Sequence, residues 1–240
     1  MSNKLKIFLG ISYLIVLTFF LYFVFSYLEI NRLGDFSYYK ELQISIENYI
    51  TDNVIINLIY FAIFTIIWIS LLGFGSPITI ASGILFGKWL GTLVSLISVC
   101  FGALILYSIT DFFFKDLVKR VLDKRFGKYI QVFQKNEFFY YFIYRFIGGL
   151  GLPFFLQNTL PVIFSMKKSN YFFSSLLGLI PGFFIFNTIG AGLNTYIKKS
   201  ETFSLLNLIF TQEIYIPILT FICLIIISVL IKKKFFDDRY

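Results

Sequence analysis

The segment VIINLIYFAIFTIIWISLLGFGSPITIASGILFG extends from Val54 to Gly87 and contains no charged residue. A helix that crosses a membrane needs about 20 apolar residues, so this segment is too long for a single span. The cluster Gly73-Phe-Gly-Ser-Pro77 interrupts it, and glycine and proline in such clusters mark turns. The chain is therefore expected to turn inside the membrane or at its edge near Ser76.

The composition of the 240-residue chain also requires a membrane. Hydrophobic residues make up 58% of the sequence and charged residues 14%, whereas an ordinary soluble domain has roughly 25% charged residues. A soluble fold of this size cannot bury such a large number of apolar side chains. Lipid must therefore surround part of the chain. Disordered, collagenous and disulfide-rich secreted proteins are excluded as well.

The content of reactive side chains excludes several function classes. The chain has no histidine, and its two cysteines, Cys100 and Cys223, are far apart in apolar runs. Zinc sites need clustered cysteine and histidine, and serine or cysteine nucleophiles are usually activated by histidine. We therefore expect no enzyme, no metal, no cofactor and no nucleic-acid partner. The net charge of +8 favours anionic headgroups of membrane lipids as partners, and the sequence leaves a homo-oligomer open.

The pattern of apolar segments predicts an all-α polytopic membrane protein. It has about five transmembrane helices, two opposed re-entrant hairpins in an inverted repeat, and one interfacial amphipathic helix. A first helix and a connecting loop fill residues 1–53, and a last helix and a basic tail fill residues 198–240. The central part, 54–197, is expected to contain hairpins at about 74–91 and 138–166, spans at 92–112 and 170–195, and the amphipathic helix at 113–135.

Two half-helices are expected to begin at corresponding places in the two halves of the chain. Ser76 precedes Pro77, where serine can cap free amides and proline fits the first helical position. Gly151 and Pro153 repeat this arrangement, and Pro181-Gly182 is expected to break or kink the following span. Backbone that is not helical at membrane depth must be buried or line a cavity, and half-helix N-termini favour anions there. The alternative is that these clusters are tight turns at the membrane surface.

Arg145 is the strongest single candidate for a functional residue. It is the only charged residue from Phe138 to Met166, and arginine at the bilayer centre costs about 2.5–3.5 kcal/mol on insertion scales. Near the half-helix at Pro153, its guanidinium is expected to bind a phosphate, with Gln157 and Asn158 as polar lining. Alternatively, Arg145 reaches the interface and anchors the hairpin, while the two amides satisfy hairpin carbonyls.

Acidic residues inside the membrane distinguish proton-driven from passive transport. Residues 54–110 and 138–200 contain no acid, so direct proton coupling is not expected. Asp111 and Glu137 lie at span edges, where their role is undecided between function and a charge at a helix end.

The distribution of basic residues predicts the orientation of the chain. They gather in the amphipathic helix, in the Lys167-Lys168 pair and in the C-terminal lysines, and positive residues favour the cytoplasmic side. The C-terminus is therefore expected to be cytoplasmic, whereas the side of the N-terminus stays open. We expect a bacterial inner membrane, because the many Phe, Ile and Lys residues are typical of an AT-rich genome.

Two blocks of sequence resemble the DedA superfamily of VTT-domain membrane proteins, also called SNARE-associated Golgi protein-like. The first is SPITIASGILFGKWLGTL at 76–93, which resembles the family's proline, its Gly-x-x-Phe-Gly at Gly83 to Gly87, and a following glycine. The second comprises Tyr144-Arg145-Phe, Leu152-Pro153, Asn158, Leu177-Gly178-Leu-Ile-Pro181-Gly182 and Gly190-Ala191. The resemblance covers about Val54 to Leu193 and implies two re-entrant hairpins that meet from opposite membrane faces.

The resemblance also implies a function. Members of the family have been linked to lipid scrambling or flipping, including recycling of carrier lipids, and to envelope or organelle homeostasis. This chain departs from the family pattern at Asp111, where an arginine is usual, at Pro161, where glycine is common, and near Pro77, where the acids of the proton-dependent branch are missing. The hypothesis is a phospholipid or polyprenyl-phosphate scramblase in which Arg145 and the two half-helix ends meet the phosphate. A small-anion or ion transporter and a non-transporting assembly factor are the alternatives.

Overall fold

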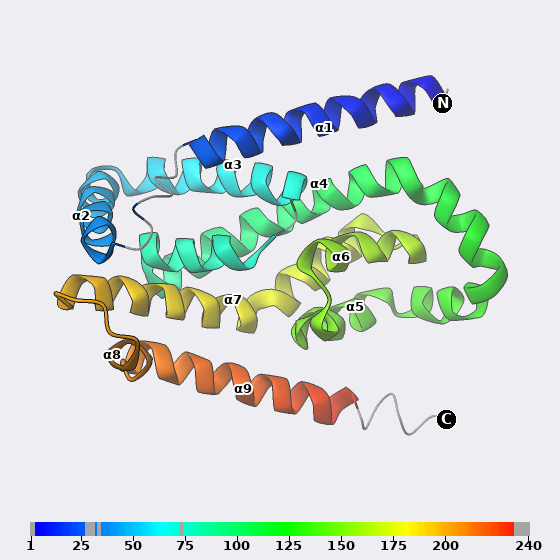
Figure 1. The fold of residues 1–240 in the computed structure, drawn as a ribbon. Helices are drawn as coiled ribbons and strands as arrows, with labels where there is room; N and C mark the ends of the chain where they lie inside the picture. Colours follow the sequence, from blue (N-terminus) through cyan, green and yellow to red (C-terminus); the bar gives the residue numbers. More distant parts are fainter. Residues whose placement is uncertain (1–2, 27–31, 33–34, 73, 233–240) are drawn as a thin grey trace.

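The computed structural model describes residues 3–26, 32, 35–72 and 74–232, and this part of the chain is a bundle of helices (Figure 1). The helices are α1 (Asn3–Ser26), α2 (Phe36–Asp52), α3 (Val54–Leu72), α4 (Ser76–Lys135), α5 (Glu137–Phe146), η2 (Gly148–Gly151), α6 (Phe154–Thr159), η3 (Leu160–Phe164), α7 (Lys168–Lys199), α8 (Leu205–Ile209) and α9 (Gln212–Lys232). No strand occurs in the described residues. The prediction of an all-α fold is confirmed.

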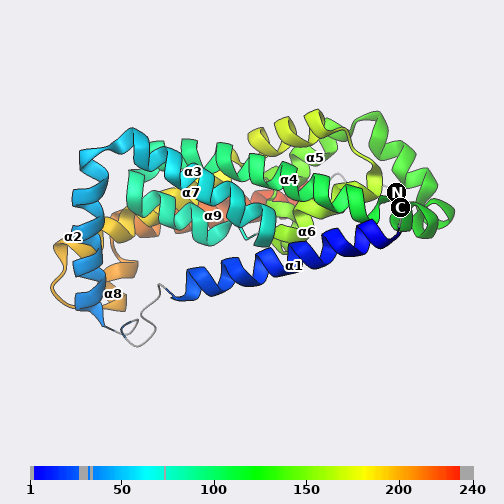
Figure 2. The ribbon, with the colours of Figure 1, turned by 90° about the horizontal axis from the view of Figure 1, so that it is seen from above.

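The long helices lie roughly side by side, and α2 crosses them at one end of the bundle (Figure 2). Three helical segments are long and apolar enough to cross a membrane: Val54–Leu71, Ser76–Phe113 and Lys168–Lys199. The described parts of α1 and α9 contain shorter apolar stretches, so the predicted count of about five spans stays a prediction.

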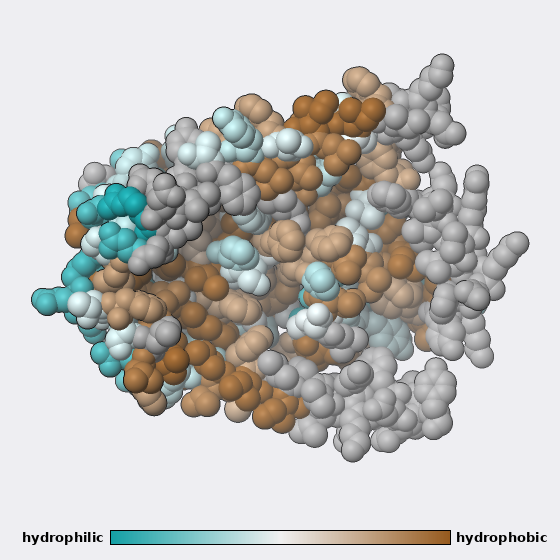
Figure 3. Space-filling view, in the orientation of Figure 1, coloured by the Kyte–Doolittle hydropathy of each residue, from teal (hydrophilic) through white to brown (hydrophobic). Residues whose placement is uncertain are grey.

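Much of the surface is apolar. Figure 3 shows hydrophobic residues spread over the long helices and hydrophilic ones gathered at the end where α2 lies. Large apolar side chains such as Phe19, Ile55 and Trp89 are among the most exposed. An exterior of this kind is stable in lipid and not in water, so the chain is a membrane protein.

The first hairpin turns at Gly87. Its backbone angles, φ 72° and ψ 179°, lie outside the helical region and divide α4 into Ser76 to Phe86 and the remainder. The Ser82 hydroxyl donates a hydrogen bond of 2.7 Å to the Gly91 carbonyl, so the residues on either side of Gly87 lie against each other. The short helix begins at Ser76, where the sequence expected a half-helix to start, and the depth of this turn in a membrane stays a prediction.

Replacement of Gly87 by alanine is expected to destabilise the protein by about 1–3 kcal/mol, because this backbone region is almost restricted to glycine. No atom lies within 4 Å of the added Cβ, so the effect comes from the backbone alone. Thermal unfolding in detergent measures it, with Gly10→Ala as the control, because that glycine also has open space and lies in a regular helix. Equal stability of the two variants would show that the turn does not need glycine.

The second hairpin turns on three glycines, Gly148, Gly149 and Gly151, whose φ values are 76°, 66° and 77°. The Tyr141 hydroxyl on α5 donates a hydrogen bond of 2.8 Å to the carbonyl of Gln157 on α6, which ties the two arms of the hairpin together. The half-helix expected after Pro153 is short: α6 ends at Thr159, and the 3-10 helix η3, with Pro161 in its first turn, continues the arm.

Pro181 and Gly182 do not break the helix, because α7 is helical through both residues from Lys168 to Lys199, and the predicted kink there stays a prediction. Proline removes one backbone hydrogen bond, but packing on both sides holds the helix together. Gly178 lies against α5 and Gly190 against α4, each close enough that a Cβ there would meet backbone atoms.

The predicted amphipathic helix is the continuation of α4, whose helical backbone reaches Lys135 without a separate start at residue 113. Figure 1 shows this later part of α4 curving round at one end of the bundle. The side chains of residues 114–129, and with them most of the predicted basic face, lie outside the described residues. The basic tail at 233–240 also lies outside them, so the predicted side of the C-terminus is not tested.

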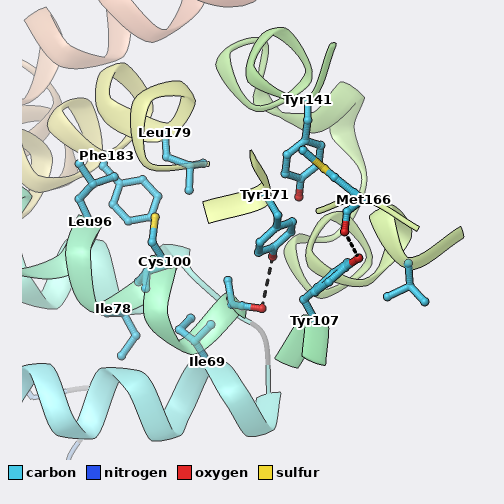
Figure 4. Close-up of a cluster of buried hydrophobic side chains, with 13 residues drawn as sticks. Ile69, Ile78, Leu96, Cys100, Tyr107, Tyr141, Met166, Tyr171, Leu179 and Phe183 are labelled. Atoms are coloured by element: carbon cyan, nitrogen blue, oxygen red, sulfur yellow. Dashed lines mark hydrogen bonds between the residues drawn. The ribbon is translucent and has the colours of Figure 1, made fainter. Parts of the chain in front are cut away.

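The core is formed where α7 packs against α4 and α5. Its buried members include Leu96 and Cys100 on α4, Tyr141 on α5, and Leu179 and Phe183 on α7 (Figure 4). This core holds both hairpins in place, because one end of α7 contacts the second hairpin and the other end the first.

Candidate functional site

Arg145 lies in the last turn of α5 and is 1% exposed. Its Nη1 donates a hydrogen bond of 3.2 Å to Gln157 Oε1, and its Nη2 donates to Asn158 Oδ1 and, over 3.3 Å, to the Tyr171 hydroxyl. The structure therefore brings together the three polar residues that the sequence proposed as a site, and it adds Tyr171 from α7. Arg145 does not reach the surface of the protein, and its place relative to the membrane interface stays a prediction. Gln157 Nε2 donates a hydrogen bond of 2.7 Å to the Leu152 carbonyl, so this amide does satisfy a hairpin carbonyl, as the alternative expected.

Aromatic rings surround the same guanidinium. The Arg145 Cζ atom lies 5.0 Å from the ring centre of Tyr141, 5.2 Å from that of Phe154 and 5.9 Å from that of Tyr171. Figure 4 shows Tyr141 and Tyr171 close together, with Tyr107 beyond them, and the Tyr107 and Tyr171 rings are stacked at 4.7 Å. Ring faces attract a cation, so they offset part of the free energy that burial of the charge costs.

The site has more hydrogen-bond donors than acceptors. No described carboxylate forms an ion pair with Arg145, whereas Arg32 pairs with Glu41 and Lys198 with Glu47 elsewhere in the described residues. Two buried donor atoms, Arg145 Nε and Asn158 Nδ2, have no partner among the described residues. Most buried donors in proteins are paired, so a positive site with two free donors is suited to an anion.

Two glycines allow the segments around Arg145 to pack closely against each other. A Cβ on Gly178 would lie 2.6 Å from the Arg145 Cβ, and one on Gly149 would lie 2.1 Å from the Gln157 Cδ. Both positions are tighter than a side chain allows, so glycine lets α7 approach α5 and lets the hairpin loop approach α6.

Glu137 does not belong to this site. Its buried carboxylate accepts hydrogen bonds from the Lys167 backbone amide, at 3.2 Å to Oε1, and from Asn170 Nδ2, at 2.6 Å. It therefore caps the start of α7, where the helix dipole favours a negative charge. The sequence left the role of Glu137 open between a functional residue and a charge at a helix end, and the geometry favours the charge at a helix end.

Asp111, the other acid at a span edge, is partly buried on α4, one turn after Tyr107.

The residue that precedes the first hairpin helix, Gly75, lies close to the Arg145 site. A Cβ on Gly75 would lie 3.2 Å from the Phe154 ring, and that ring faces Arg145. The expected capping by Ser76 is wrong: Gly75 is the N-cap, no side chain caps the helix, and Ser76 is already helical. Ser76, Pro77 and Pro153 are all exposed, so the two helix starts lie beside the buried site and not inside it.

Gly83 lies against a second polar cluster, around Asn187, which sequence reasoning missed. A Cβ on Gly83 would lie 2.1 Å from the Asn187 carbonyl oxygen. Asn187 is fully buried on α7, donates to Ser95 Oγ over 3.2 Å, and has an Oδ1 atom without a partner among the described residues. The available signal was an amide in the middle of an apolar stretch of the helix. Gly87 closes the hairpin at a distance from Arg145, so neither glycine joins the Arg145 site.

Comparison with known proteins places this architecture in a family. Residues 54–192 match the family model described as the VTT domain, which confirms the resemblance read from the two sequence blocks. The match begins at the residue where the sequence placed the central unit and ends five positions before its predicted end at 197. It includes both hairpins and the Arg145 site. No solved structure matches the chain.

Proposed function

Because this chain belongs to the VTT-domain family of membrane proteins, we propose that it moves phosphate-bearing lipids between the two leaflets. The substrate class is a phospholipid or a polyprenyl phosphate, and the membrane is a bacterial inner membrane with the C-terminus in the cytoplasm. No bond is made or broken, so the proposed activity needs no catalytic residue and no cofactor.

The donor-rich site around Arg145 carries this proposal. A buried guanidinium without a described carboxylate partner, with its own Nε unpaired and the unpaired Asn158 Nδ2 beside it, offers a phosphate the charge and geometry that it prefers. Lipid movement across a bilayer is slow because the headgroup loses its hydration in hydrocarbon. Hydrogen bonds from Arg145 and Asn158 would replace part of that hydration.

Access to the site requires the second hairpin to move. Arg145 is buried beneath Phe154 and Tyr141, so in the proposed cycle the arm that carries Phe154 separates from α7. The phosphate then replaces Gln157 and Asn158 as acceptor, and the three glycines of the turn absorb the change in backbone angles. Because 54–110 and 138–200 contain no acid, we propose passive movement without proton coupling.

A dithionite assay on vesicles with fluorescent lipid and purified protein tests the proposal. Loss of fluorescence beyond the outer-leaflet half supports it, and loss limited to that half contradicts it. Phosphate efflux from the same vesicles, with lipids left in place, would instead identify the transporter of small anions.

Asn158→Asp separates phosphate binding from a structural role of the same residues. The new carboxylate lies beside Arg145 and pairs with it, so we expect the fold to be retained. The same carboxylate occupies the place of the phosphate, and lipid movement is expected to fall by about tenfold or more, which corresponds to about 1.4 kcal/mol. The dithionite assay measures this, with Asn207→Asp on the exposed surface of α8 as the control. Full activity of Asn158→Asp would exclude the site.

A further inference from the structure

A large groove lies where α2 crosses the end of the bundle, away from Arg145. It has a volume of about 530 Å³ and is formed by α2, α3 and the tip of the first hairpin, in the region where Figure 2 shows α2 crossing the other helices. Aromatic side chains dominate its lining, among them Tyr49, Tyr60, Phe61, Phe64 and Phe86. The volume falls within the range of about 300–1,000 Å³ that is usual for ligand sites.

A smaller, polar cavity of about 160 Å³ adjoins this groove. Three side chains, Ile46, Ile50 and Leu85, line both cavities, so the two adjoin where α2 meets the hairpin tip. The polar lining of the smaller cavity comes from Gln43, Glu47 and Asn194. An apolar groove beside a polar cavity is suited to a ligand that has both an apolar and a polar part.

Glu47 is the charged residue that lines the polar cavity, and it forms an ion pair with Lys198 beside the lining residues. Glu47 Oε1 lies 2.5 Å from Lys198 Nζ on α7, and Glu47 Oε2 accepts a hydrogen bond of 2.7 Å from Gln43. The hydrogen bond from Lys198, followed by that from Gln43, holds the pKa of Glu47 below its ordinary value. The pair is about half exposed, so both charged groups remain accessible to a bound headgroup.

We propose that the two cavities bind one zwitterionic phospholipid, with an acyl chain in the aromatic groove, its ammonium on Glu47 and its phosphate on Lys198. The apolar lining suits an acyl chain, and an adjacent acid and base complement a headgroup that has both charges. An anionic phospholipid would satisfy only Lys198. This lipid is held at the end of the bundle, so the proposal goes beyond lipid movement through the Arg145 site and does not depend on it.

The test is a competition between two lipids. The full-length protein is incorporated in vesicles of equal parts phosphatidylethanolamine and phosphatidylglycerol, extracted in mild detergent, and its retained lipid is quantified by mass spectrometry. We expect the wild type to retain about one lipid per chain and to prefer phosphatidylethanolamine. Glu47→Gln is expected to lower that preference by about threefold, the effect of one exposed charge pair. The control is Glu41→Gln, an exposed acid on the same helix that pairs with Arg32.

A second variant tests the groove itself. Ser45 lines the groove and is exposed on α2, so Ser45→Phe fills the groove without disturbing the core and is expected to remove most of the retained lipid. Enrichment of phosphatidylglycerol, an unchanged preference in Glu47→Gln, or full retention in Ser45→Phe would overturn the proposal. Asn158→Asp is expected to retain the lipid, so failure at this groove is distinguishable from failure of the proposed transport.

Discussion

Replacement of Arg145 by glutamine is expected to slow lipid movement by about a hundredfold. The variant loses the guanidinium charge and its hydrogen bonds to Gln157, Asn158 and Tyr171. Hydrogen bonds to a charged group contribute about 1.5–3 kcal/mol each, and about 3 kcal/mol in the barrier corresponds to roughly two orders of magnitude in rate. The initial rate of fluorescence loss in the dithionite assay, per folded protein, measures the effect.

Two further variants separate the charge from its geometry. Arg145→Lys keeps a positive charge but loses the planar fork, so an intermediate rate is expected. Arg32→Gln removes an arginine that pairs with Glu41 on the exposed surface, and a rate equal to that of the wild type is expected. A site that only stabilises the fold would give Arg145→Gln a lower unfolding temperature and an unchanged rate per folded molecule, which would contradict the proposed role.

Replacement of Gly190 by alanine is expected to have the largest effect on stability. The added Cβ would lie 2.2 Å from the Ile80 carbonyl oxygen and 3.0 Å from the Gly83 Cα. These are backbone atoms of the first hairpin, so α7 and the hairpin must move apart. Overpacking of this kind costs about 1–3 kcal/mol, and the loss of contact at a helix crossing of small residues adds to it.

Gly182→Ala is the matched control for Gly190→Ala because it makes the same change in the same helix. No atom lies within 4 Å of a Cβ there, and alanine favours a helix over glycine by about 1 kcal/mol. The two variants are therefore expected to change the unfolding temperature in opposite directions. Thermal unfolding followed by size-exclusion chromatography measures both, and a similar shift would show that α7 does not pack closely on the hairpin.

Local sequence patterns predicted the features that depend on local chemistry. The Ser76-Pro77 pair indicated the start of a short helix, which begins at Ser76, and an isolated arginine in an apolar run indicated the buried site. Gln157 and Asn158 were found because they are the polar residues nearest to Pro153. Each of these inferences concerns residues within a few turns of one another.

Features that depend on packing between distant segments were missed. Tyr171 and Asn187 both lie on α7, and only the position of that helix brings one to Arg145 and the other to Ser95. Tyr141 could have been predicted from the sequence, because it precedes Arg145 by four residues and therefore lies on the same face of the helix. The helix continues through Pro181, and its composition does not show the neighbours on α5 and α4 that Gly178 and Gly190 contact.

The most direct test of the central claim compares lipid scrambling by the wild type and by Arg145→Gln in vesicles of one composition, with equal amounts of folded protein confirmed in each. The account predicts fluorescence loss beyond the outer-leaflet half for the wild type and loss close to that half for the variant over the same time. Equal and complete loss for both proteins would show that lipid crosses without Arg145, and it would contradict the account.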